Sequence, residues 1–183
     1  LSIISILYNE EECVEPFVRE TVKVLSSIPN LEYEIIFIND CSTDNSLIKI
    51  VNQNKLNPKV KLINMARRFG PMESIMAGVK SASGDALINI DIDLQDPPSL
   101  IPQMVKYWLN DGYDVVYTTR TKRKGETVVK RLVSNIGYRI LKLFTYVEIE
   151  RDSGDFRLIS RRVINEYVKF GENLPFFRFV IDY

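Results

Sequence analysis

The sequence predicts an α/β fold, with one mostly parallel central sheet and helices on both of its faces. Short apolar segments alternate along the chain with amphipathic stretches of helical spacing, and this order is typical of such sheets. The length of 183 residues suits a single domain covering residues 1–183. Hydrophobic residues make up 45% of the chain and charged residues 26%, which is the balance of a globular protein.

Each element is predicted from its own apolar pattern. Strands are expected at residues 2–7, 33–38, 60–63, 86–90 and 114–118. Helices are expected at residues 11–27, from about residue 44, at residues 71–81 and at residues 98–109. The first helix would place Val14, Phe17, Val18, Val22 and Leu25 on one apolar face.

Composition excludes several kinds of chemistry. The chain has no histidine, which removes the usual general base, the usual zinc ligand and every Ser-His or Cys-His nucleophile. Carboxylates must therefore carry any acid–base or metal chemistry, and oxygen ligands favour Mg²⁺ or Mn²⁺. The 24 basic and 24 acidic residues balance, so no overall field argues for a nucleic-acid partner. Cys13 and Cys41 are too few for a disulfide framework.

Polar residues follow the predicted strands where parallel sheets bind their ligands. The first four strands are followed in turn by Tyr8-Asn9-Glu10, Asn39-Asp40, Arg67 and Asp91-Ile92-Asp93. Asp91 and Asp93 alternate with apolar residues, so both carboxylates are expected on one side. Two like charges this close favour a divalent cation, which would also bind diphosphate oxygens. Asp44 is expected to cap the helix that follows it.

Five ordered segments resemble the dolichol-phosphate mannose synthase-like polyprenyl-phosphate glycosyltransferases of glycosyltransferase family 2. Asp91-Ile92-Asp93-Leu94-Gln95-Asp96-Pro97-Pro98 looks like the family's Asp-x-Asp-Leu-Gln-x-Pro-Pro signature. The other four are residues 8–12, 39–44, 67–70 and 152–158. Asn39 and Cys41 depart from the family's Asp and Gly, and Arg68 stands where the family often has Asn.

The resemblance implies a glycosyltransferase A-type fold, that is, a Rossmann-like domain that binds a nucleotide sugar. It places Tyr8, Asn9, Glu10 and Asp40 around the nucleotide base, and Arg67 at the diphosphate or its loop. It places Ile92 in the donor-binding segment and makes Asp91, Asp93 and Gln95 the ligands of Mg²⁺ or Mn²⁺. The side chains at these positions suit the implied roles. The Asp40 carboxylate can accept a hydrogen bond from a base N–H, and Gln95 adds a neutral oxygen ligand for the metal.

The resemblance also marks residues for catalysis and for the acceptor. Asp155 holds the position favoured as catalytic base, with Asp152 as a second candidate. A lipid phosphate is already anionic, so Asp155 could instead orient the acceptor or support the metal. Arg120, Arg131 and Ser134 align with positions that contact the acceptor phosphate. Residues 120–142 carry eight basic side chains against Glu126 alone, with apolar residues at helical spacing, a pattern that favours a membrane surface.

The function implied is an inverting transfer of glucose or a related hexose from a UDP or GDP sugar to a polyprenyl or dolichyl phosphate. It would occur at the cytoplasmic face of a membrane. The aromatic run at residues 176–179 fits an interfacial belt, and transmembrane helices often follow in the family, which implies a chain cut before such an anchor. A sugar nucleotidyltransferase and a response-regulator-like module remain as alternatives. The sequence leaves the oligomeric state open, including a homo-oligomer.

Overall fold

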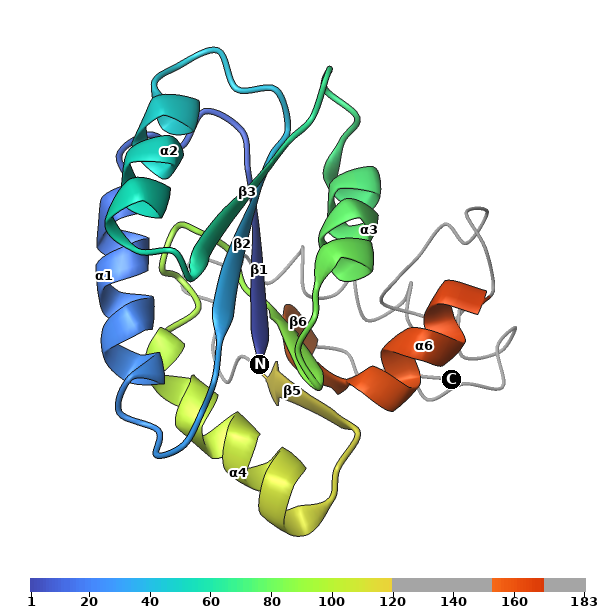
Figure 1. The fold of residues 1–183 in the computed structure, drawn as a ribbon. Helices are drawn as coiled ribbons and strands as arrows, with labels where there is room; N and C mark the ends of the chain where they lie inside the picture. Colours follow the sequence, from blue (N-terminus) through green and yellow to red (C-terminus); the bar gives the residue numbers. More distant parts are fainter. Residues whose placement is uncertain (120–152, 170–183) are drawn as a thin grey trace, which may run out of the picture.

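The computed structural model describes residues 1–119 and 153–169, which form a six-stranded sheet between two layers of helices (Figure 1). The order of the strands across the sheet is β3-β2-β1-β4-β6-β5. The strands are β1 (Ser2–Leu7), β2 (Glu34–Asn39), β3 (Val60–Asn64), β4 (Ala86–Asn89), β5 (Val115–Thr119) and β6 (Ser153–Ser160). The first four pair in parallel, whereas β6 runs antiparallel to both β4 and β5. The predicted α/β fold with a mostly parallel sheet is confirmed.

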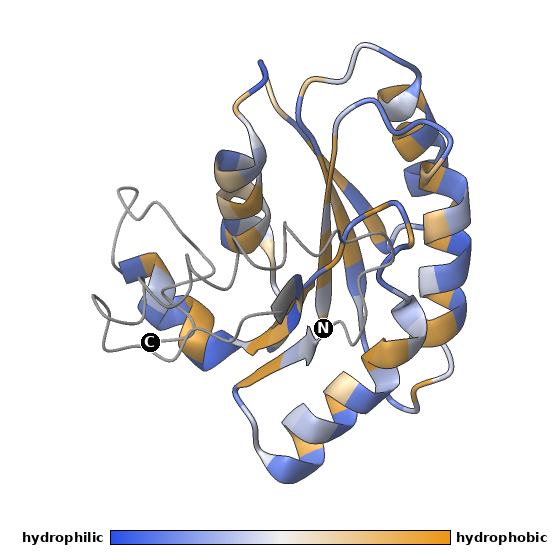
Figure 2. Cartoon of the chain, turned by 180° about the vertical axis from the view of Figure 1, so that it is seen from behind, coloured by the Kyte–Doolittle hydropathy of each residue, from blue (hydrophilic) through white to orange (hydrophobic). Residues whose placement is uncertain are grey.

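Helices cover both faces, as predicted. One face carries α1 (Val14–Leu25), α2 (Ser46–Leu56), the short 3-10 helix η1 (Pro98–Leu100) and α4 (Ile101–Asp111). The other carries α3 (Pro71–Ser81) and α6 (Arg161–Lys169). The helices are apolar on one side and hydrophilic on the other (Figure 2), so each buries a single stripe of side chains against the sheet.

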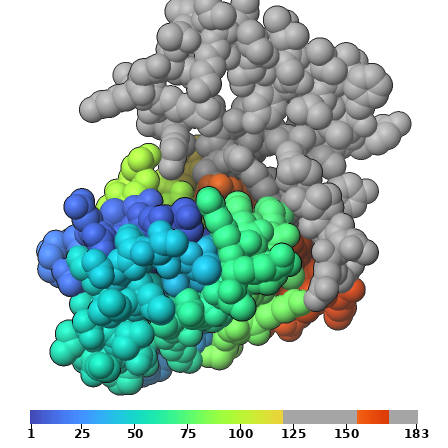
Figure 3. Space-filling view, turned by 90° about the horizontal axis from the view of Figure 1, so that it is seen from above, coloured from blue at the N-terminus to red at the C-terminus, as the bar shows by residue number. Residues whose placement is uncertain are grey.

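Three of the parallel strands, β1, β2 and β3, end level with one another. In the register of the sheet, Leu7 of β1 lies beside Asn39 of β2, and Asn39 lies beside Asn64 of β3. The loops that leave these strands therefore start at one edge of the sheet. Figure 3 looks down on this end of the molecule, where the blue, cyan and green segments lie side by side.

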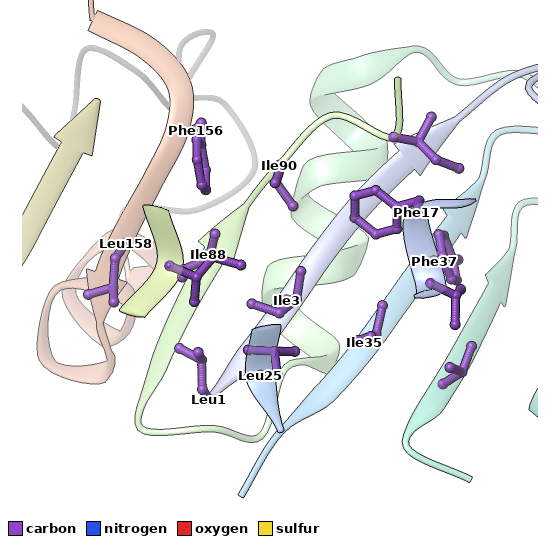
Figure 4. Packing of buried hydrophobic residues seen from close by; sticks show 14 of the residues in the cluster. Leu1, Ile3, Phe17, Leu25, Ile35, Phe37, Ile88, Ile90, Phe156 and Leu158 are labelled. Carbon is purple, nitrogen blue, oxygen red and sulfur yellow. The ribbon is translucent and has the colours of Figure 1, made fainter. Parts of the chain in front are cut away.

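The larger core lies between the sheet and α1, α2 and α4 (Figure 4). The rings of Phe17 and Phe37 meet edge to face, with centroids 5.7 Å apart. On the other face, Gly78 lets α3 approach the sheet closely. A Cβ at Gly78 would lie 2.9 Å from Cδ1 of Ile38, which is too short for carbon atoms in contact. This packing holds α3 against β1 and β2.

The structure agrees closely with most predicted elements. The bounds of β1 and α3 match the prediction, β3 and β4 differ from it by one residue at one end, and β2 and β5 are shifted by one residue at both ends. The predicted helix at residues 11–27 is shorter, because residues 11–13 form a turn in which the amide of Cys13 donates to the Glu10 carbonyl oxygen at 3.0 Å. The strand β6 and the helix α6 were not predicted.

Several predictions fall outside the described residues. The basic segment at residues 120–142 and the aromatic run at residues 176–179 both lie there, so the membrane-surface interpretation and the single-domain prediction for residues 1–183 stay predictions. Within residues 1–119 and 153–169, no helix is long and apolar enough to span a bilayer.

Candidate functional site

Four loops meet at the edge of the sheet where the parallel strands end. They comprise residues 8–13, 40–45, 65–70 and 90–97, which follow β1, β2, β3 and β4 in turn. Together these loops contain eight acidic side chains and two basic ones, Arg67 and Arg68. The negative charge of these loops would repel an anionic ligand. A bound cation or the two arginines must therefore offset the charge of the carboxylates before such a ligand can bind.

Backbone strain is concentrated in the same loops. Asn9, Cys41 and Leu94 have φ angles of 56°, 60° and 59°, in the left-handed region that side chains with a Cβ rarely adopt. Strained residues of this kind cluster at ligand sites, where the surrounding structure holds them in place. The family has glycine at the position of Cys41, and glycine adopts this conformation without strain. The departure at Cys41 therefore places a strained residue in the loop.

The loops after β1 and β2 are tied together by hydrogen bonds. The amide of Asn9 donates to Ser42 Oγ at 3.0 Å, and Asn9 Oδ1 accepts from the amide of Thr43 at 2.8 Å. The amide of Glu10 donates to Ser46 Oγ at 3.0 Å. The side chain of Asn9, predicted to bind substrate, therefore joins two loops, while Tyr8 and Glu10 are half-buried beside it.

Asp44 completes this link between the loops. Its Oδ1 accepts from the amide of Ser46 at 3.0 Å, and its Oδ2 accepts from the amide of Glu11 at 3.1 Å. Burial alone would raise the pKa of Asp44, but the hydrogen bonds from Ser46 and Glu11 outweigh it and lower the pKa. Asn45 occupies the N-cap position of α2 but makes no capping bond with its side chain; the predicted capping by Asp44 is made from one residue earlier, through its bond to the amide of Ser46.

Asp40 lies buried at the centre of the edge. Its amide donates to the Leu7 carbonyl oxygen at 3.0 Å, which places Asp40 beside the end of β1. Its Oδ1 accepts from the amide of Phe69 at 2.8 Å and its Oδ2 from the amide of Gly70 at 2.9 Å. Asp40 thus fastens the loop that follows β3. Each carboxylate oxygen has a second lone pair, so a base N–H could still donate to Asp40.

The two arginines of that loop stack on different rings. The guanidinium carbon of Arg67 lies 4.5 Å from the ring centre of Phe69, and that of Arg68 lies 3.9 Å from the ring centre of Tyr8. Arg67 was predicted to contact the ligand, whereas Arg68 is the one that touches a predicted base-pocket residue. The sequence signal for Arg68 was its departure from the family's Asn.

The segment predicted to hold a metal leaves the sheet just after β4. β4 ends at Asn89, and the side chains of Asp91 and Asp93 are exposed while that of Ile92 is buried in the core. The amide of exposed Gln95 donates to Asp93 Oδ1 at 3.0 Å, which bends the chain into a turn. Any contact between Ile92 and a ligand would therefore have to come from its backbone.

Asp155 reaches this edge from a distant part of the chain. β6 pairs antiparallel with β4 so that Asn89, the last residue of β4, faces Arg157, which places Asp155 two residues from this pair, on the side where β4 ends. Asn89 Nδ2 donates to the Asp155 carbonyl oxygen at 3.4 Å, and the side chain of Asp155 is exposed. Asp152, Arg120, Arg131 and Ser134, the other predicted residues, lie outside the described residues.

The carboxylates fit a metal ion that is shared with a substrate. In the described part of the chain, no three His, Cys, Asp or Glu side chains are grouped to hold a metal by themselves. Mg²⁺ is commonly held by one or two carboxylates together with substrate phosphates. Asp91 and Asp93, with the amide oxygen of Gln95, offer a donor set of this kind on an exposed turn.

The fold, with four loops gathered at this edge, is that of glycosyltransferases of the A type. A mannosyltransferase of Pyrobaculum calidifontis, solved with GDP-Man and Mn²⁺, has a TM-score of 0.58 at 16% identity, over 91% of this chain and 46% of that one. Glucosyl-3-phosphoglycerate synthase from Mycobacterium tuberculosis, solved with Mn²⁺, UDP-Glc and phosphoglyceric acid, has a TM-score of 0.62 at 18% identity, over 88% of this chain and 56% of that one.

The chain belongs to glycosyl transferase family 2, which it matches over residues 2–168. It is 40% identical over 182 residues to the uncharacterized glycosyltransferase YkcC of Bacillus subtilis, covering 100% of this chain and 56% of that protein. It is 34% identical over 184 residues to the bactoprenol glucosyl transferase of Shigella phage SfV, covering 100% of this chain and 59% of that protein. The chain thus spans little more than half of these relatives, and the resemblance to family 2 is confirmed.

Proposed function

We propose that this chain binds a nucleoside-diphosphate sugar and, with Mg²⁺ or Mn²⁺, transfers glucose or a related hexose to a polyprenyl phosphate with inversion. The observation that carries the proposal is the row of side chains along one sheet edge: Asp40 after β2, Tyr8 after β1, Asp91 and Asp93 after β4, and Asp155 in β6. The similarity to bactoprenol glucosyl transferases supports the lipid acceptor.

The length of this row of side chains matches that of an extended nucleotide-sugar donor. Neighbouring strands lie about 4.8 Å apart, so the distance from β2 to β6 is about 14 Å. The base would lie at Asp40 and Tyr8, the diphosphate at Asp91 and Asp93, and the sugar towards Asp155. The complexes with GDP-Man and Mn²⁺ and with UDP-Glc and Mn²⁺ in proteins of this fold support a metal-bound donor of the UDP or GDP type.

The transfer is a single displacement at the anomeric carbon. A phosphate oxygen of the acceptor attacks this carbon from the face opposite the diphosphate, and the bond to the diphosphate oxygen breaks, so the nucleoside diphosphate leaves with the electron pair. A Mg²⁺ or Mn²⁺ ion held by Asp91, Asp93 and Gln95 would offset the charge on that leaving group. The acceptor phosphate needs little deprotonation near neutral pH, so Asp155 would serve to orient it.

The acceptor dictates where the reaction takes place. A polyprenyl phosphate keeps its phosphate at the membrane surface, so the chain would act at the cytoplasmic face of a membrane. Arg120 and Arg131 would hold the acceptor phosphate, because a planar guanidinium matches phosphate oxygens. The many basic side chains of residues 120–142 would favour an anionic lipid surface.

Calorimetric titration with UDP and with GDP, each with and without Mn²⁺, tests the donor site. Metal-dependent binding of one of them is expected, with the metal dependence lost in Asp93→Ala and kept in Asp111→Ala. Asp111 is a suitable control because it is exposed at the far end of α4. Failure of both nucleotides to bind would contradict the proposal.

A product assay with nucleotide sugar and polyprenyl phosphate tests the reaction. Release of nucleoside diphosphate that depends on the lipid is expected, and Asp93→Ala should abolish it. Wild-type turnover by Asp93→Ala would refute the metal assignment. Release of pyrophosphate would instead indicate a sugar nucleotidyltransferase.

A further inference from the structure

The contact between Arg68 and Tyr8 spans the end of β2. Arg68 follows β3 and Tyr8 follows β1, and β2 lies between these two strands in the sheet. With its guanidinium carbon 3.9 Å from the ring centre of Tyr8, the Arg68 side chain must reach across the end of β2, which Asp40 follows. The next two residues along the chain, Phe69 and Gly70, donate their amides to Asp40.

This arrangement brings a hydrogen-bond donor beside a hydrogen-bond acceptor. Asp40 is buried and acts as an acceptor when ionised, whereas Arg68 is exposed and can only donate. Stacking on Tyr8 involves the π face of the ring and leaves N–H groups of the guanidinium to serve another partner. A ligand that lies against both side chains must therefore present an N–H and an acceptor oxygen next to each other.

We propose that Arg68 selects the nucleobase of the donor, an inference that rests on the proposed function. A ring N–H would donate to Asp40 while Arg68 donates to the carbonyl oxygen next to that N–H. Uracil and guanine both have this pair of neighbours on one edge. Cytosine and adenine have an unprotonated ring nitrogen beside an amino group. Their ring nitrogen, an acceptor, would face the acceptor Asp40, and their amino group, a donor, would face the donor Arg68. Arg68 thus favours uracil or guanine over cytosine and adenine.

The order of the strands separates this role from diphosphate binding. Asp91 and Asp93 follow β4, which flanks β1 on the side away from β2. Arg68 lies on the ring of Tyr8, and the two residues that follow it in the chain donate their amides to Asp40 after β2. A cation held at this point lies beside the base of a donor whose diphosphate is bound near Asp91 and Asp93.

The test compares the affinities of UDP, GDP, CDP and ADP for the wild type, Arg68→Ala and Arg68→Lys, all with Mn²⁺. The wild type is expected to prefer UDP or GDP. Arg68→Ala should weaken the preferred nucleotide about tenfold, the effect of one hydrogen bond from a charged donor, and leave CDP and ADP nearly unchanged. The affinity of Arg68→Ala for the corresponding nucleoside monophosphate should fall by the same factor, because the lost contact is to the base. Arg68→Lys should lose selectivity as well, because lysine lacks the planar fork.

Arg67→Ala is the matched comparison from the same loop. It should change the affinity for all four nucleotides by a similar factor and so leave the selectivity unchanged, because Arg67 stacks on Phe69 and not on Tyr8. An equal loss for all four nucleotides in Arg68→Ala, or full recovery in Arg68→Lys, would overturn the assignment of Arg68 to the base. Failure of the wild type to bind any of the four nucleotides would instead overturn the proposed function together with this inference.

Discussion

Glu34, at the start of β2, is a buried carboxylate that ties three strands to the turn before β4. Its side chain is 8% exposed. Its Oε1 accepts from Ser2 Oγ at 2.6 Å and from the amide and the hydroxyl of Ser83 at 2.7 Å and 2.8 Å, and its Oε2 accepts from Lys61 Nζ at 2.6 Å. Burial alone would raise the pKa of Glu34, but the hydrogen bonds from Lys61, Ser2 and Ser83 lower it to about 2.

This low pKa makes the stability of the fold depend on pH. The ordinary pKa is 4.5, so ionised Glu34 contributes about 3 kcal/mol of unfolding free energy at neutral pH. Because the folded-state pKa is the lower one, the contribution is complete above pH 4.5 and is lost as the pH falls towards 2. Glu34→Gln removes the charge, and we expect it to cost about 2 to 3 kcal/mol at pH 7 and roughly half as much at pH 3.

Urea unfolding followed by the fluorescence of Trp108, the single tryptophan, measures the effect. Glu32→Gln is the matched control, because the Glu32 side chain is 95% exposed and meets Lys59 only at 3.6 Å. We expect this control to change the unfolding free energy by less than about 0.5 kcal/mol at either pH. A loss in Glu34→Gln that is no larger than in the control, or that is equal at pH 7 and pH 3, would refute the reasoning.

Three further substitutions test the strain and packing around the site. Cys41→Gly should raise the midpoint of thermal unfolding, through a gain of about 0.5 to 1 kcal/mol, because it relieves a residue at φ 60°; an unchanged or lower midpoint would argue against strain. Gly78→Ala should cost about 1 kcal/mol or more in urea unfolding, since its Cβ would meet Ile38 at 2.9 Å; a neutral result would mean that α3 can shift. Asp40→Asn should cost about 1 to 3 kcal/mol without nucleotide, because an amide nitrogen cannot accept from a backbone N–H; unaltered stability would show that Asp40 does not fasten the loop.

The sequence predicted the elements whose signals are local. α3 begins at Pro71, which suits the first turn of a helix, and its apolar residues recur with helical spacing. β1 is a continuous apolar run, typical of a strand buried on both faces. β6 has no such signal, because Asp155 and Arg157 interrupt its apolar residues. It forms through pairing with β4 and β5, which lie far away in the chain.

The same division holds for the candidate site. From the sequence alone, the strand ends, the absence of histidine and the ordered motifs determined that carboxylates such as Asp40, Asp91 and Asp93 gather at one edge. The tertiary structure alone decided that Arg68 lies on Tyr8, that the Asn9 side chain joins two loops, and that β6 carries Asp155 to this edge. Periodicity records which face of an element is buried, but the contacts of a loop side chain depend on which strands become neighbours, and that is set by packing between distant segments.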